Sequence, residues 1–197
     1  MDLANLALDW WYVVLLIVAV VAAAVTDLRS GKIYNAITLP ALAAGLVGHA
    51  LLGGLTGQDT SRSIGLIGSL LGVAMGGTMV AAWLAGGVNG GDAKLMIAIG
   101  SLTGWAFTLD VIVWGLVAAV AMAVVVMIRR RVFMRTIGRI ARFLSLIATP
   151  GKPAVPTSDD SPTVPFGVAL CVGTAIALVR GLVQYGLDPY LVIRHGH

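Results

Sequence analysis

The chain has 197 residues, of which 58% are hydrophobic and 11% are charged, and its formal net charge is +4. Soluble domains carry about 25% charged residues, so this composition excludes a soluble globular domain and indicates an integral membrane protein. The single cysteine, Cys171, excludes an intramolecular disulfide and a cysteine-rich zinc site. The basic residues cluster beside apolar segments, which indicates membrane topology and lipid contact rather than nucleic-acid binding.

Apolar segments of about 20 residues can cross a bilayer, and the sequence predicts six of them. Asp2 and Asp9 precede the first apolar run, where a cleaved signal peptide would carry positive charge, so we interpret that run as the first span. Residues 95–128 would form a helix about 51 Å long, too long for a hydrocarbon core of about 30 Å. We therefore place a break in the stretch GWAFTLD. The predicted spans are residues 10–25, 36–52, 63–84, 93–107, 111–128 and 164–185.

Residues 129–163 form the predicted loop before the last span. Basic and apolar side chains alternate at helical spacing in its first part, which is typical of an amphipathic helix on an anionic leaflet. Its second part is rich in proline and serine, as in flexible linkers. We expect an all-α membrane protein with a single domain over residues 1–197. The basic positions of the amphipathic segment are Arg131, Arg135, Arg139 and Arg142.

The positive-inside rule orients these spans. Only Arg62, Arg180 and Arg194 fall on one side of the membrane, which is therefore the outer side and carries both termini. The other side is the cytoplasmic face. Its basic residues are Arg29, Lys32, Lys94, Arg129, Arg130, Arg131, Arg135, Arg139, Arg142 and Lys152.

Two aspartates share the cytoplasmic end of the predicted spans. Asp27 follows the first span and Asp92 precedes the fourth, and the hairpin of the second and third spans returns the chain to the same face. Two carboxylates close together cannot both ionise easily and share a proton. One can then activate water as a general base while the protonated one polarises a scissile carbonyl. The helix dipole favours an anion at a helix N-terminus, which makes Asp92 the more readily ionised partner as a hypothesis, although the pair titrates as a unit.

Each aspartate also has a simpler interpretation. Asp92 could be the N-cap of the fourth span, with Gly90 and Gly91 as its turn, and Asp27 could be an interfacial stop signal. Paired carboxylates also serve as proton or cation sites in transporters. Against transport, both aspartates lie at the interface, and the sequence has no inverted repeat. Composition and topology alone therefore name no reaction.

Three stretches resemble the type IV prepilin peptidases, a family of GxGD-type membrane aspartyl proteases. TDLRSGKIYN resembles the first catalytic segment of that family, and NGGDAKLMIAIG resembles the second, which carries the GxGD motif. PFGVAL, residues 165–170, resembles the Pro-aromatic-Gly motif that opens the last span. Two positions depart from the pattern: Asn89 replaces the first motif glycine, and Tyr34 stands where many members have proline. Asn tolerates left-handed backbone conformations, so the turn can survive.

The resemblance implies an aspartic endopeptidase that cuts the short basic leader of a prepilin or pseudopilin at the cytoplasmic face of the inner membrane. The first cytoplasmic loop lacks the paired CxxC motifs of larger members, so the resemblance is to the short form of Flp-type (tight-adherence) pilus systems, or to archaeal preflagellin peptidases. We expect no cofactor, no zinc and no methyltransferase activity. A noncatalytic assembly protein is a further alternative, favoured by Asn89.

The resemblance also assigns residues. Asp27 and Asp92 would be catalytic. Arg29 and Lys94 would pair with the dyad or with a substrate carboxylate, or would only anchor the chain at the membrane surface. Asn35 would cap the second span or orient a carboxylate. The remaining positions would support the motifs or let a substrate backbone approach closely: Gly86, Gly87, Asn89, Gly90, Gly91, Pro165 and Gly167.

Overall fold

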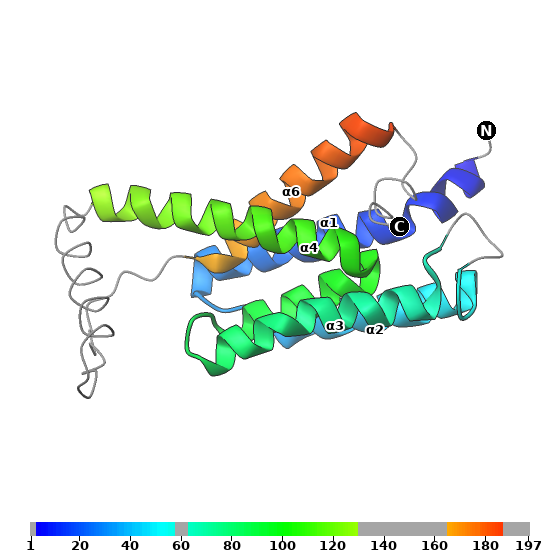
Figure 1. Cartoon of the computed structure of the whole chain (residues 1–197), viewed down its shortest axis with the longest axis horizontal. Helices are drawn as coiled ribbons and strands as arrows, with labels where there is room; N and C mark the ends of the chain where they lie inside the picture. Colours follow the sequence, from blue (N-terminus) through cyan, green and yellow to red (C-terminus); the bar gives the residue numbers. More distant parts are fainter. Residues whose placement is uncertain (1–2, 58–62, 130–164, 187–197) are drawn as a thin grey trace, which may run out of the picture. The chain divides into compact units, whose positions relative to one another are not determined.

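The computed structural model describes residues 3–57, 63–129 and 165–186, and the secondary structure in these ranges is entirely helical (Figure 1). The all-α prediction is therefore confirmed for this part of the chain. The described residues up to Ala118 and from Pro165 onward form one compact unit, which contains the site, and residues 119–129 belong to a second unit. The helices are α1 (Leu3–Ser30), α2 (Asn35–Gly53), α3 (Gly65–Leu84), α4 (Gly90–Arg129) and α6 (Phe166–Tyr185).

Five helices in the described ranges are long and apolar enough to cross a membrane, with α4 counted once. Helix α4 has 40 residues and contains both the fourth and the fifth predicted spans. Its helical path is broken at Gly104, whose φ of 75° and ψ of −179° are not helical. The break lies inside the predicted stretch, but the helix resumes at Trp105. Asp110, which we expected to precede the fifth span, is therefore inside a helix.

Gly104 explains why the break falls where it does. Its positive φ is readily available only to glycine. A Cβ at this position would also lie 3.2 Å from the Cδ1 atom of Ile64. Figure 1 shows the chain turning back at the break in α4, so that the first segment of α4 and residues 105–118 run in opposite directions.

Helix α1 is longer than predicted because its sequence contains no helix breaker before Gly31. Gly31 has a φ of 63°, and its N–H donates to the carbonyl of Asp27 at 2.8 Å, as in glycine-terminated helix ends. The predicted first span ended at residue 25, whereas the helix continues to Ser30. Asp27 consequently lies on the last turn of α1 rather than in the connection that follows it.

Small residues allow α4 to lie against α2, α3 and α6. A Cβ on Gly76 would lie 2.7 Å from the carbonyl carbon of Met96, and one on Gly45 would lie 2.7 Å from the carbonyl carbon of Ser101. A Cβ on Gly173 would lie 2.5 Å from the backbone nitrogen of Gly115. Close backbone approach of this kind is typical of helix packing in membranes.

A buried histidine also ties these helices together. His49 Nε2 lies 2.9 Å from the carbonyl oxygen of Leu102, just before the break in α4, and Nδ1 lies 2.8 Å from Ser63 Oγ. Because a carbonyl only accepts, Nε2 carries the proton and Nδ1 accepts from the serine hydroxyl. The ring therefore links α2 both to α4 and to the residues that precede α3.

The ends of three helices meet at one end of this unit. Helices α1 and α6 pack side by side, and fully buried side chains hold the first segment of α4 against them, with Leu16, Leu95, Met96, Ile99 and Leu170 each at most 1% exposed. The last turn of α1 and the first turns of α4 and α6 come together there. The predicted amphipathic helix at Arg131–Arg142 lies outside the described residues.

Candidate active site

Asp27 is held by a residue that is far away in the sequence. Its side chain is 7% exposed. Its Oδ2 atom accepts a hydrogen bond of 2.8 Å from the backbone N–H of Gly167, on the first turn of α6. The bond is buried, and it joins positions 140 residues apart. Because the side chain projects from the last turn of α1 toward the start of α6, the carboxylate lies where the two helices converge.

Asp92 is held by its own helix terminus. It is 2% exposed, and its Oδ2 atom accepts a hydrogen bond of 3.2 Å from the backbone N–H of Asn89. The carbonyl of Asn89 in turn accepts from the N–H groups of Asp92 and Ala93, at 3.1 and 3.3 Å. Asn89 is therefore the N-cap of α4 and Asp92 is its third residue, whose carboxylate accepts from the N-cap N–H as in one half of a capping box. The alternative interpretation of Asp92 as the N-cap is wrong.

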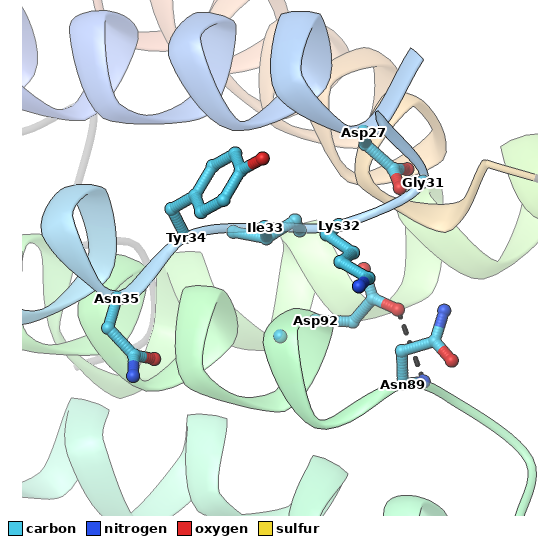
Figure 2. A pocket seen from close by; sticks show the side chains of 9 residues that line it. Asp27, Gly31, Lys32, Ile33, Tyr34, Asn35, Asn89 and Asp92 are labelled. Atoms are coloured by element: carbon cyan, nitrogen blue, oxygen red, sulfur yellow. Dashed lines mark hydrogen bonds between the residues drawn. The ribbon is translucent and has the colours of Figure 1, made fainter. Parts of the chain in front are cut away.

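Both aspartates line one pocket with a volume of about 410 Å³. Figure 2 shows the α1–α2 connection passing between them, with Asp27 above the connection and Asp92 below it. Four of the lining residues in and beside this connection are exposed: Gly31, Lys32, Tyr34 and Asn35. Its lining residues are Asp27, Gly31, Lys32, Ile33, Tyr34, Asn35, Asn89, Gly91 and Asp92.

The pocket is poor in compensating charge. Two buried carboxylates face it, and Lys32 is the cationic residue among those that line it. Like charges in a partly desolvated space oppose each other's ionisation, which makes this pair a candidate for acid–base chemistry. A pair of this kind can remove a proton from water and donate one in the same step.

Ile33 closes the space between the two motif segments. An ideal Cβ on Gly91 would lie 3.0 Å from the Cβ of Ile33, and one on Gly167 would lie 3.1 Å from its Cδ1 atom. The isoleucine therefore packs against the first turns of α4 and α6, and glycines at both positions let those turns approach it. This packing fixes the course of the connection beside the two aspartates.

Several residues that were predicted for the site make contacts other than those predicted. Arg29 is exposed and is not among the residues that line the pocket. The side chain of Asn35 accepts a hydrogen bond of 2.9 Å from Lys94 Nζ. Tyr34 rather than Asn35 occupies the N-cap position of α2, so the capping prediction for Asn35 is wrong. Lys94 thus bridges α4 and α2 at the surface.

The remaining predicted residues lie around the pocket. Gly90 packs near the indole of Trp83, 3.2 Å from its Nε1 to an ideal Cβ. Gly86 and Gly87 are in the exposed α3–α4 connection and do not line the pocket. Pro165 directly precedes α6 with a φ of −68°, which fixes the start of the helix that carries Gly167.

Sequence reasoning missed the α1–α2 connection as part of the pocket. Gly31, Lys32, Ile33 and Tyr34 all line it, although only the flanking Asp27 and Asn35 were predicted. The available signal was Gly31, a helix breaker four residues after a buried aspartate. A connection that begins so close to the carboxylate has to pass beside it.

Metal binding finds no support in the described residues. Among them, no group of three or more histidine, cysteine, aspartate or glutamate side chains could hold a metal ion. The two aspartates form a pair without a third ligand of these types. The absence of zinc from the whole chain stays a prediction.

The fold and the site define a helical membrane-type protein with two buried aspartates in one pocket at a helix end. The sequence profile of the type IV leader peptidase family matches residues 14–127, which is more than half of the chain. The chain belongs to this family, and the predicted resemblance is confirmed. Searches of curated proteins and of solved structures found no match.

Proposed function

We propose that the protein is a prepilin leader peptidase that cuts Flp-type prepilins through the dyad of Asp27 and Asp92. The observation that carries the proposal is the position of the two carboxylates. They come from helix ends far apart in the sequence, both are buried, and both line the same open pocket. Family membership supplies peptide-bond hydrolysis as the reaction. The pocket supplies the two acid–base groups that this reaction needs.

The chemistry follows from one shared proton. The ionised carboxylate takes a proton from a water molecule, and the resulting hydroxide adds to the scissile carbonyl. The protonated carboxyl polarises that carbonyl during the attack. The amide nitrogen then receives a proton and leaves as the new amino terminus, while the leader leaves with a carboxylate. The backbone N–H groups of Asn89 and Gly167 hold one oxygen of each aspartate during these steps.

The substrate and its approach follow from the membrane setting. With six spans and positive residues inside, the pocket would open at the cytoplasmic face of the inner membrane. A prepilin helix in the bilayer would then present its leader junction at the depth of the dyad. The protein would act as a single peptidase domain over residues 1–197, in contact with lipids, without zinc and without N-methylation of the product.

Co-expression with a tagged Flp-type prepilin in a bacterial host that has no prepilin peptidase tests this function. Leader removal is read from the size of the prepilin on a gel. Asp27→Asn and Asp92→Asn should each lower the cleavage rate by roughly 10²–10⁴-fold, the usual contribution of a general acid or base. An archaeal preflagellin, offered in parallel, decides between the two substrate classes.

Asp110→Asn is the matched control. Asp110 is also on α4, but its Oδ2 atom lies 4.0 Å from Arg180 and the residue does not line the pocket. Cleavage should persist in this variant. If cleavage persisted in both dyad variants, the proposed mechanism would be wrong. Proton flux in proteoliposomes without any cleavage would favour the transport alternative instead.

A further inference from the structure

The carboxylates of the two aspartates accept hydrogen bonds from different places: one from its own helix, the other from α6. Asp92 accepts a hydrogen bond from the N-cap residue of its own helix, so the position of its carboxylate depends only on the start of α4. Asp27 is bonded to Gly167 on another helix, so its carboxylate depends on how closely α6 approaches α1. The family profile ends at residue 127, and Gly167 therefore lies outside the matched part of the chain.

Gly167 has no room for a side chain. An ideal Cβ there would lie 2.9 Å from Asp27 Oδ2 and 3.1 Å from Asp27 Cβ. The nearest obstacle is thus the end of the aspartate side chain, on the same oxygen that accepts the backbone hydrogen bond. This oxygen can rotate away, whereas the Cβ of Asp27 and the Cδ1 atom of Ile33, each 3.1 Å from the added methyl group, would have to shift by a few tenths of an ångström.

We propose that Gly167 is a positioning residue that fixes the rotation of the Asp27 carboxylate. Its N–H directs Oδ2 toward α6 and leaves Oδ1 for water and substrate, and its missing side chain allows the contact. This inference rests on the proposed function and adds the last helix to the catalytic machinery. Catalysis is sensitive to such placement, because an error of about 1 Å can cost roughly 10²-fold in rate.

Gly167→Ala keeps the backbone N–H but forces the carboxylate to move. Since Asp27 can rotate, the variant should fold normally and keep its thermal stability. Its kcat should fall roughly 10- to 100-fold, while KM for the prepilin should stay within about twofold because binding of the rest of the substrate is retained.

Gly173→Ala, two turns further along α6, is the matched control. Its Cβ would lie 2.5 Å from the backbone nitrogen of Gly115, and backbone cannot rotate away. This variant should lower thermal stability and the yield of folded protein. Its folded fraction should keep a kcat within about twofold of wild type, because the contact does not involve the dyad.

A second readout requires no substrate. In protein labelled with ¹³C at the aspartate carboxyls, the Asp27 resonance is assigned by its loss in Asp27→Asn. At a single pH it should shift in Gly167→Ala and stay in place in Gly173→Ala. An unmoved Asp27 resonance in Gly167→Ala, or a wild-type kcat in that variant, would overturn the positioning role. If wild-type protein cut no prepilin, the proposed function would fail, and the resonance would still decide the role of Gly167.

Discussion

Asn89 is the residue at which the motif departs from its family, and the structure gives the departure a simple reason. The contacts of Asn89 with Asp92 and with the first turn of α4 use its backbone: the N–H donates to Asp92 Oδ2, and the carbonyl accepts from Asp92 and Ala93. A glycine at this position would make the same contacts. The asparagine is therefore compatible with an active site and gives no sign of decay.

This reading predicts that position 89 needs an N–H and tolerates different side chains. Asn89→Gly and Asn89→Ala should cut prepilin at a rate within roughly threefold of wild type, because both variants keep the backbone N–H that donates to Asp92. Asn89→Pro removes the N–H and should lower kcat roughly 10- to 100-fold, since a hydrogen bond to a charged group contributes about 1.5–3 kcal/mol. Initial rates with purified protein measure the difference. Loss of cleavage in Asn89→Gly would show that the side chain itself is required.

At the residue scale, charge pattern located the two aspartates because acidic residues are rare and have few positions in a membrane protein. The same pattern could not place Asn35, since a cap depends on which carbonyl accepts the first helical bonds. That carbonyl belongs to Tyr34. The sequence allowed several hydrogen-bond or ion-pair partners for Lys94. Its partner in the structure is Asn35, and that pairing depends on how α2 and α4 pack.

At the scale of the helices, some glycines lie where two helix backbones are in close contact. Gly76 and Gly77 are neighbours on α3 with opposite surroundings. A Cβ on Gly76 would lie 2.9 Å from the Cα of Ile97, whereas one on Gly77 would meet nothing within 4 Å. Adjacent positions on one helix therefore separate the effect of packing from that of helix propensity.

Gly76→Ala should destabilise the protein by about 1–3 kcal/mol, because overpacking forces the backbones of α3 and α4 apart. Gly77→Ala should stabilise it by about 0.5–1 kcal/mol, since alanine favours the helix over glycine by that amount. Thermal unfolding in detergent, followed by circular dichroism, measures both variants under identical conditions. Equal effects of the two substitutions would contradict the close contact between α3 and α4.

Helix existence was predictable and helix boundaries were less so. Apolar length located every described helix, and the limit on span length predicted the break in α4. The break falls at Gly104 because that residue adopts a positive φ, which hydropathy does not measure. The extension of α1 to Ser30 brings Asp27 into a helix, and only the glycine that follows it signals the true end.

For the molecule as a whole, the least predictable feature was the link between its two ends. The hydrogen bond from Gly167 to Asp27 spans 140 residues, and no local periodicity reports a contact at that separation. The motif resemblance placed residues 165–170 in the last span without giving them a partner. The structure supplies the partner: the first turn of the last helix donates a hydrogen bond to one of the two aspartates that line the pocket.

Membrane topology gives the last prediction, which follows from the proposed orientation. Helix α3 is long and apolar enough to cross a bilayer, so the connections at its two ends should lie on opposite sides. Leu55, before α3, is 68% exposed, and Ala85, after it, is also exposed. With Cys171 replaced by alanine, Leu55→Cys should react with a membrane-impermeant maleimide in intact cells, because the positive-inside rule places it outside. Ala85→Cys should react only after the cells are permeabilised, since the proposed orientation places this end of α3 at the cytoplasmic face. Reaction of Ala85→Cys in intact cells would invert the topology and move the dyad away from the compartment in which a prepilin carries its leader.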